Sequence, residues 1–128
     1  MELLNMTKRL DLTFEEAVEK VQNALKEQGF GIITEIDVKE TLKKKLNVDY
    51  KKYKILGACN PTLAKRALDI DKEVGTLLPC NVIVYETDRG TQVSMQKPLE
   101  MIKILKNDNL NEVAEEAESK LQNALASL

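Results

Sequence analysis

The sequence predicts an α+β fold in which a single sheet of about five strands has helices packed on one side or on both. Two observations lead to this prediction. Five segments have the alternation or the short apolar runs that are typical of strands, and apolar residues recur at helical spacing in the segments between them. The resulting order is β-α-β-α-β-α-β-β-α-α, which mixes helical crossovers with a hairpin. The size of 128 residues and a hydrophobic content of 43% fit one domain, residues 1–128.

The first two elements are a strand and a helix. Alternating positions from Leu4 to Leu12 are mostly apolar, which is typical of a half-buried strand. Thr13 followed by Glu16 matches a capping box, and Gly29 supplies the left-handed residue at which many helices end. The apolar positions between them have helical spacing: Phe14, Ala17, Val18, Val21, Ala24 and Leu25.

A second strand is expected over residues 30–38. Its alternation divides the side chains between two faces, with Phe30, Ile32, Ile36 and Val38 on one and Gly31, Ile33, Glu35 and Asp37 on the other. Asp37 is then placed to cap a short helix that ends near Leu46. Residues 53–59 follow as a third strand.

The next helix has a well-defined start, because Asn60 suits the N-cap and Pro61 the first helical position. A turn and a short helical piece lead to a strand over residues 80–86. The run Val82-Ile83-Val84 in this strand predicts burial on both of its faces.

The chain is expected to end with a hairpin strand and two helices. A turn at residues 88–90 connects the fourth strand to a fifth over residues 91–96. Pro98 opens the first of these helices, and the last one covers residues 110–125.

Composition excludes several function classes. The absence of histidine removes His-dependent nucleophile pairs and His-ligated zinc or haem. A net charge of −2 and an aromatic content of 4% argue against a nucleic-acid partner. No stretch reaches the roughly 18–20 apolar residues of a membrane span, and no signal-peptide core is present. We therefore expect a cytoplasmic protein without a membrane partner.

Two similar steps, Ala58-Cys59-Asn60-Pro61 and Leu78-Pro79-Cys80-Asn81, mark the candidate site. If strands 53–59 and 80–86 are antiparallel neighbours, Cys59 and Cys80 can meet, with Asn60 and Asn81 beside them. A thiol pair can cycle between dithiol and disulfide or coordinate a soft metal ion. We expect that the chain requires no cofactor to fold, and a soft metal ion is the one candidate cofactor. The alternatives are that both thiols are packing residues, or that the site is a ligand pocket in which the thiols take no part.

Three further side chains are candidates for the same site. Glu35 and Asp37 are two apart on a strand, so their carboxylates share a face and can bind a cation or move protons. Tyr53 begins the strand that ends at Cys59 and can donate a phenolic hydrogen bond. Solvated carboxylates and a packed ring are the structural alternatives.

These motifs also resemble a known family. The segments Thr34-Glu35-Ile36-Asp37-Val38, Tyr53 to Pro61 and Leu77 to Val82 are similar to those of domain-of-unknown-function family 302 of bacteria and archaea. The resemblance implies a small α+β domain that is often a homodimer and has no assigned activity. Many members lack both cysteines, which makes the thiols a feature of a subgroup.

Three functional hypotheses follow. The leading one is a binding or sensing module in which the Cys59/Cys80 cluster takes a soft metal or an unidentified small molecule, or undergoes dithiol redox. The second is a cysteine-dependent enzyme, with Cys59 as nucleophile and Glu35 or Asp37 moving protons. The third is a structural or interaction protein with packed thiols.

A homodimer is the expected assembly, in part because the family resemblance implies it. Two surfaces are candidates for the interface. Strand 91–96 carries few of the charges that discourage pairing at a sheet edge, and the last helix has small residues at Ala114, Ala117 and Ala124.

Overall fold

The computed structural model describes residues 3–128, and it confirms the predicted α+β fold and element order. The strands are β1 (Asn5–Leu10), β2 (Gly31–Asp37), β3 (Tyr53–Cys59), β4 (Cys80–Thr87) and β5 (Gly90–Gln96). The helices are α1 (Phe14–Glu27), α2 (Val38–Leu46), α3 (Pro61–Ile70), α4 (Pro98–Ile102) and α5 (Asn111–Ala126). Short 3-10 segments are η1 (Lys72–Leu77), η2 (Lys103–Leu105) and η3 (Asp108–Leu110).

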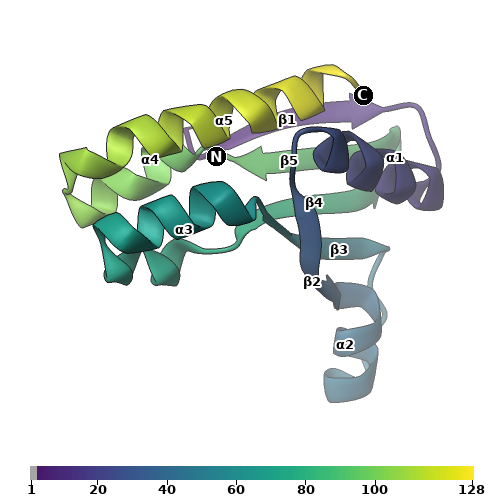
Figure 1. Cartoon of the computed structure of the whole chain (residues 1–128). Helices are drawn as coiled ribbons and strands as arrows, with labels where there is room; N and C mark the ends of the chain where they lie inside the picture. Colours follow the sequence, from purple (N-terminus) through teal and green to yellow (C-terminus); the bar gives the residue numbers. More distant parts are fainter. Residues whose placement is uncertain (1–2) are drawn as a thin grey trace.

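The five strands form one antiparallel sheet in the order β1-β5-β4-β3-β2 (Figure 1). The last strand therefore inserts between the first strand and the β4 strand of its own hairpin. The two edges are β1 and β2, which are the first two strands along the chain. The prediction that residues 91–96 lie at an edge is wrong, because β5 pairs with β1 on one side and with β4 on the other.

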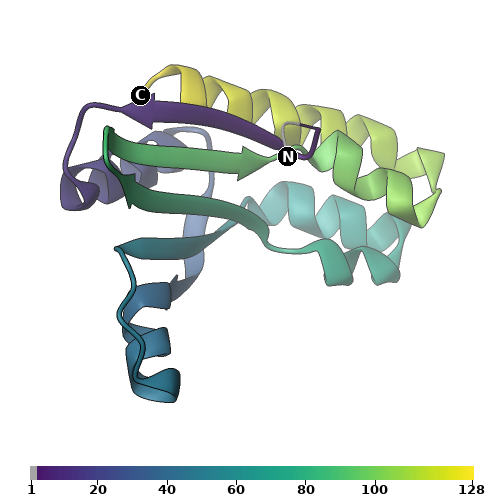
Figure 2. The ribbon, with the colours of Figure 1, turned by 180° about the vertical axis from the view of Figure 1, so that it is seen from behind.

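Helices cover one face of this sheet, and the strands lie in front of them when the molecule is seen from behind (Figure 2). The covered face carries a core of fully buried side chains to which α1 and α5 contribute: Val21, Leu25, Leu56, Val82, Val84, Val93, Met95 and Leu121. Ile83 points to the other face and is only half-buried. The predicted burial of residues 82–84 on both faces is therefore wrong, since none of the helices within residues 3–128 covers the second face.

A second apolar cluster lies beyond the end of the sheet and is built from α3, η1, α4, η3 and α5. The N-terminal half of α5 packs here through Val113 and Ala117, whereas its C-terminal half packs on the sheet through Leu121 and Leu125. One helix therefore joins the two cores. The predicted surface of small residues on this helix is not free, because Ala114, Ala117 and Ala124 are all buried within the chain.

A β-bulge in β2 changes the predicted alternation. Ile32 lies opposite Ala58, and after the irregularity at Ile32/Thr34, Ile36 lies opposite Ile55. Ile32 is thus on the covered face and Ile36 on the open one, although the sequence pattern placed them together. An extra residue in one strand reverses the faces of all residues that follow it.

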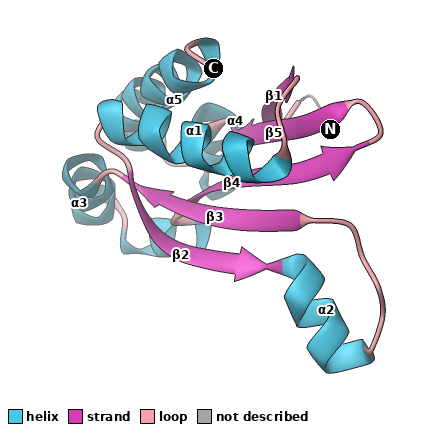
Figure 3. Cartoon of the chain, turned by 90° about the vertical axis from the view of Figure 1, so that its right-hand side faces the viewer, coloured by secondary structure: helices cyan, strands magenta, loops and turns pink. Residues whose placement is uncertain are grey.

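The helix α2 projects away from the body of the molecule at the end of β2 (Figure 3). Asp37 caps it, since its carboxylate accepts a hydrogen bond from the backbone N–H of Glu40 at 2.9 Å. This cap and the predicted end at Leu46 are confirmed, but none of the helix's residues is buried. Its apolar side is only partly covered, since Leu42 is half-buried and Leu46 is 65% exposed.

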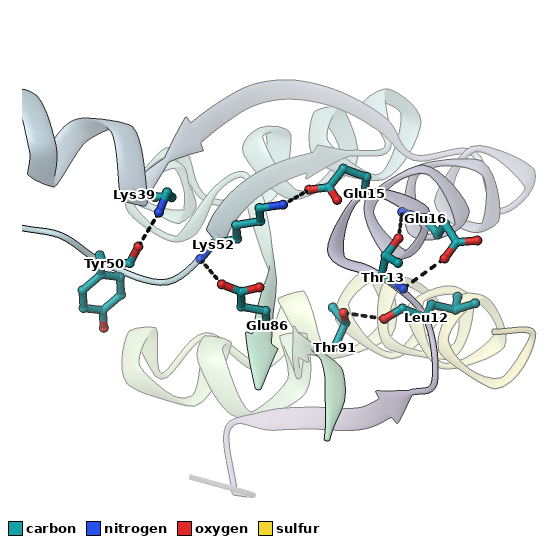
Figure 4. A network of polar contacts seen from close by, with 9 residues as sticks. All are labelled: Leu12, Thr13, Glu15, Glu16, Lys39, Tyr50, Lys52, Glu86 and Thr91. Atoms are coloured by element: carbon teal, nitrogen blue, oxygen red, sulfur yellow. Dashed lines mark hydrogen bonds and ion pairs between the residues drawn. The ribbon is translucent and has the colours of Figure 1, made fainter. Parts of the chain in front are cut away.

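The start of α1 is tied to the sheet by polar contacts (Figure 4). Thr13 and Glu16 form the predicted capping box, with reciprocal hydrogen bonds of 3.2 and 3.1 Å. The Thr91 hydroxyl of β5 donates to the Leu12 carbonyl at 2.9 Å. Lys52, just before β3, forms an ion pair with Glu15 at 2.8 Å. These contacts fix the helix over the covered face.

Within residues 3–128, no helix combines the length and the apolar character that a membrane span needs.

The turn between β4 and β5 depends on Gly90. Its φ of +117° is one that side chains rarely adopt, and a Cβ there would collide with the Leu10 carbonyl oxygen of β1. We expect Gly90→Ala to lower the free energy of unfolding by about 1–3 kcal/mol in urea titrations. Gly31→Ala is the control, because a Cβ there meets nothing within 4 Å, and it should change stability by less than about 0.5 kcal/mol. Equal effects of the two substitutions would contradict this explanation.

Candidate functional site

An apolar cavity lies where the sheet ends and the helical cluster begins. It has about 70 Å³ of space for a water-sized molecule, it opens to solvent, and its walls are almost entirely apolar. All eight residues of the second apolar cluster line it: Leu63, Ala67, Val74, Ile102, Leu110, Val113, Ala114 and Ala117. The second core is therefore arranged around a hollow.

Local sequence explains both the wall and the space. Asn60 caps α3 by accepting a hydrogen bond from the backbone N–H of Leu63 at 3.2 Å, and Pro61 occupies the first turn, as predicted. This start directs Leu63 and Ala67 toward α5. Ala67, Ala114 and Ala117 each bring only a methyl group to the region between the helices. Their short side chains leave space that larger residues would fill.

The two thiols do not form the predicted cluster. The strands β3 and β4 are antiparallel neighbours, but the residue opposite Cys80 is Ala58, and Cys59 lies one position further along. Adjacent residues of a strand point to opposite faces, so this register separates the two side chains. Both cysteines are free, without close contact between them, although each reaches part of the cavity wall.

Cys80 is a buried wall residue and Cys59 is a partly exposed one. Burial raises the pKa of the Cys80 thiol, while an interaction with the Gln96 side chain opposes the rise and Cys59 adds only a minor electrostatic contribution. A raised pKa keeps Cys80 in its protonated, unreactive form near neutral pH. Its environment favours packing over thiol chemistry.

The two asparagines differ in position. Asn60 lines the cavity, but its carbonyl oxygen already caps α3. Asn81 is exposed and lies opposite Gly57, one position along the strand from Cys80, on the uncovered side of the sheet. Only Asn60 therefore belongs to the region around the cavity.

The two carboxylates share a face as predicted, but they lie far from the cavity. Glu35 is opposite Leu56 and Asp37 is opposite Lys54, whereas the partner of Cys59 is Gly31. At about 3.3 Å per residue, Asp37 is five strand positions, or roughly 16 Å, from Cys59. Glu35 pairs with Lys54 at 2.6 Å, and Asp37 caps α2. Neither carboxylate can move a proton to or from Cys59.

Tyr53 lies at the opposite end of β3 from Cys59. Its ring stacks on that of Tyr85, the residue opposite, with 5.1 Å between ring centroids and 10° between planes. Burial, followed by the charges of Tyr85 and Tyr50, raises the pKa of Tyr53. The ring is a packing element of the open face and not a wall of the cavity.

The described part of the chain contains no cluster of three or more Cys, Asp or Glu side chains that could hold a metal ion.

The residues with the clearest role in the cavity come from its helical wall. Leu63 and Ala67 are four residues apart on α3, and Val113 and Ala117 are four apart on α5, so each pair lies on one face of its helix. Nothing in their spacing indicates that the two faces enclose a space.

The difference in exposure between the thiols predicts their reactivity. We expect brief treatment of the native protein with iodoacetamide to modify Cys59 well before Cys80, because Cys80 is buried and its pKa is raised. Mass spectrometry of the digested protein identifies the modified site. Addition of urea should equalise the two rates. Faster modification of Cys80 in the native state would contradict the description of the cavity wall.

Comparisons with known proteins agree with this architecture. The family model described as "Domain of unknown function DUF302" matches residues 6–128. The crystal structure of an uncharacterized conserved DUF302 protein from Bacillus stearothermophilus is similar at a TM-score of 0.89 and 31% sequence identity, with 95% of each chain covered. No curated protein matches the chain. Because the family model covers almost all of the sequence, this protein belongs to the family described as domain of unknown function DUF302.

Proposed function

We propose that this protein is a binding or sensing module that takes a small, largely apolar molecule into the cavity between the sheet and the helical cluster. The observation that carries the proposal is that every member of the second apolar cluster lines this space. Protein cores are normally close-packed. A core built around a hollow gives up contacts that a bound molecule would restore.

The nature of the walls supports binding over the other hypotheses. An enzyme needs groups that move protons or attack a substrate, and the two thiols are the only titratable side chains that the described residues place on the walls. Cys80 is buried and protonated, and the carboxylates proposed to assist Cys59 lie elsewhere. A soft-metal site would also need the sulfur atoms to converge on one ion. A cytoplasmic location, where thiols stay reduced, suits a protein with two free cysteines.

Filling the cavity tests the proposal. We expect toluene to bind the native protein with saturable heat in isothermal titration calorimetry, because benzene-sized molecules occupy apolar protein cavities. Ala114→Leu places three further carbon atoms in the space and should weaken toluene binding at least tenfold. Its free energy of unfolding should stay within about 1 kcal/mol of the parent, since the new atoms enter a void.

The matched control is Ala126→Leu, at the exposed end of the same helix. This variant should bind toluene as the parent does. Absence of toluene binding to the parent protein would overturn the proposal. A decrease of more than about 2 kcal/mol in the free energy of unfolding of Ala114→Leu would also overturn it, because such a decrease would mean that the site is already full.

We also propose that two copies of the chain pair through the β2 edge. Ile33 and Ile36 of this edge strand are 62% and 48% exposed. Its two acids are already engaged, Glu35 by Lys54 and Asp37 as a helix cap, so the edge presents little net charge to a second copy. The opposite edge, β1, carries Lys8 and Arg9, the kind of charges that discourage strand pairing.

Pairing of β2 with itself would be antiparallel about a twofold axis and would close at two subunits. The end of α2 and the segment that follows it support this choice, because the exposed residues Leu46, Val48 and Tyr50 leave further apolar surface beside the same edge. Burial of such surface by a second copy would stabilise the dimer through the hydrophobic effect.

Light scattering at micromolar concentration should therefore give about twice the chain mass of 14.5 kDa. Ile33→Lys puts a charge at the exposed centre of the edge and should yield a folded single chain. Thr7→Lys, which adds the same side chain to the exposed β1 edge, should remain a dimer. A single-chain mass for the parent, or equal effects of both variants, would disprove pairing through β2.

A further inference from the structure

One polar side chain on the cavity wall stands apart from the others. Gln96 ends β5, is 9% exposed and lines the apolar cavity. Its side chain interacts with the Cys80 thiol. Among residues 3–128, no fully buried side-chain nitrogen or oxygen lacks a hydrogen-bond partner, and this includes the Gln96 amide. A primary amide has two N–H donors and a carbonyl acceptor, which is more than a thiol can satisfy.

Asn60 is the other amide on the wall. Its carbonyl oxygen accepts the hydrogen bond that caps α3, and its nitrogen faces Gly29, 3.0 Å from where a Cβ of that residue would be. Cys80 is a weak hydrogen-bonding group. Among residues 3–128, Gln96 is therefore the amide on this wall whose carbonyl oxygen is not already used as a helix cap, so it can both accept from a ligand and donate to it.

Within the part of the chain that the structure describes, the wall carries no Asp, Glu, Lys or Arg side chain. An ionised ligand would have to leave water without a counter-charge, which costs far more than burying a neutral group that is hydrogen-bonded. The cavity is thus suited to molecules without a formal charge. Ligand sites commonly combine such apolar walls with a few polar groups that fix orientation.

We infer that Gln96 determines the ligand class of the cavity: an uncharged, mainly apolar molecule with one hydrogen-bonding group, such as an alcohol or a ketone, that pairs with the Gln96 amide. This inference rests on the proposed binding function. It goes further by assigning the orientation of the ligand, with its polar group toward the end of β5 and its apolar part toward the helical wall.

Three probes of similar shape separate the possibilities: toluene, benzyl alcohol and benzoate. The native protein should bind the alcohol at least tenfold more tightly than the anion, because only the anion buries a charge. Gln96→Leu should weaken the binding of benzyl alcohol by about tenfold, the size expected for one neutral hydrogen bond, and leave toluene unchanged or tighter. Gln96→Met serves as a second variant of similar length and should behave in the same way.

Gln92→Leu is the matched control, since Gln92 lies on the same strand and outside the cavity wall. It should leave the affinities for all three probes unchanged. If both Gln96 variants weaken toluene and benzyl alcohol by the same factor, or if benzoate binds as tightly as the alcohol, the inference is overturned while the binding function stands. If the native protein binds none of the probes, the proposed function is wrong, and the inference that rests on it is wrong as well.

Discussion

The long apolar face of α5 is the feature on which the rest of the structure depends. Its C-terminal half, through Leu121 and Leu125, closes the core of the sheet, and its N-terminal half, through Val113 and Ala117, forms one wall of the helical cluster. A single helix is stiff over this length, so it fixes the distance and angle between the two cores. The side chains differ along it. Large residues fill the space over the sheet, whereas alanines face α3 and leave the second core hollow.

The cavity follows from this difference and explains why thiol chemistry is not the best account of the site. Cys59 and Cys80 mark the places where β3 and β4 meet the helical cluster, so both reach the wall of the cavity. The register separates them, and burial raises the pKa of Cys80. What the region offers is an apolar cavity, open to solvent, with the Gln96 amide on its wall. That combination suits recognition of a molecule more than its chemical conversion.

The one-sided covering of the sheet has a second consequence. Because helices pack on a single face, the residues of the other face, among them the stacked pair Tyr53 and Tyr85, must shield one another. The exposed β2 edge and the projecting helix α2 adjoin this face and carry apolar residues such as Ile33 and Leu46. Surface of this kind is what a second subunit would cover. The proposed dimer contact on β2 and the proposed ligand site use different residues, because no residue of β2 lies among those that line the cavity within residues 3–128.

The sequence by itself determined the features that depend on neighbours within a few residues. The bounds of β3, the caps supplied by Thr13, Asp37 and Asn60, and the order of all ten main elements followed from local hydrogen bonding and periodicity. Only the tertiary structure decided the rest. The place of β5 inside the sheet, the register of Ala58 against Cys80, and the bulge that sends Ile32 and Ile36 to opposite faces depend on pairings between strands distant in the sequence. The hollow depends on the volumes of side chains from five segments that meet only after folding, and no local pattern encodes that sum.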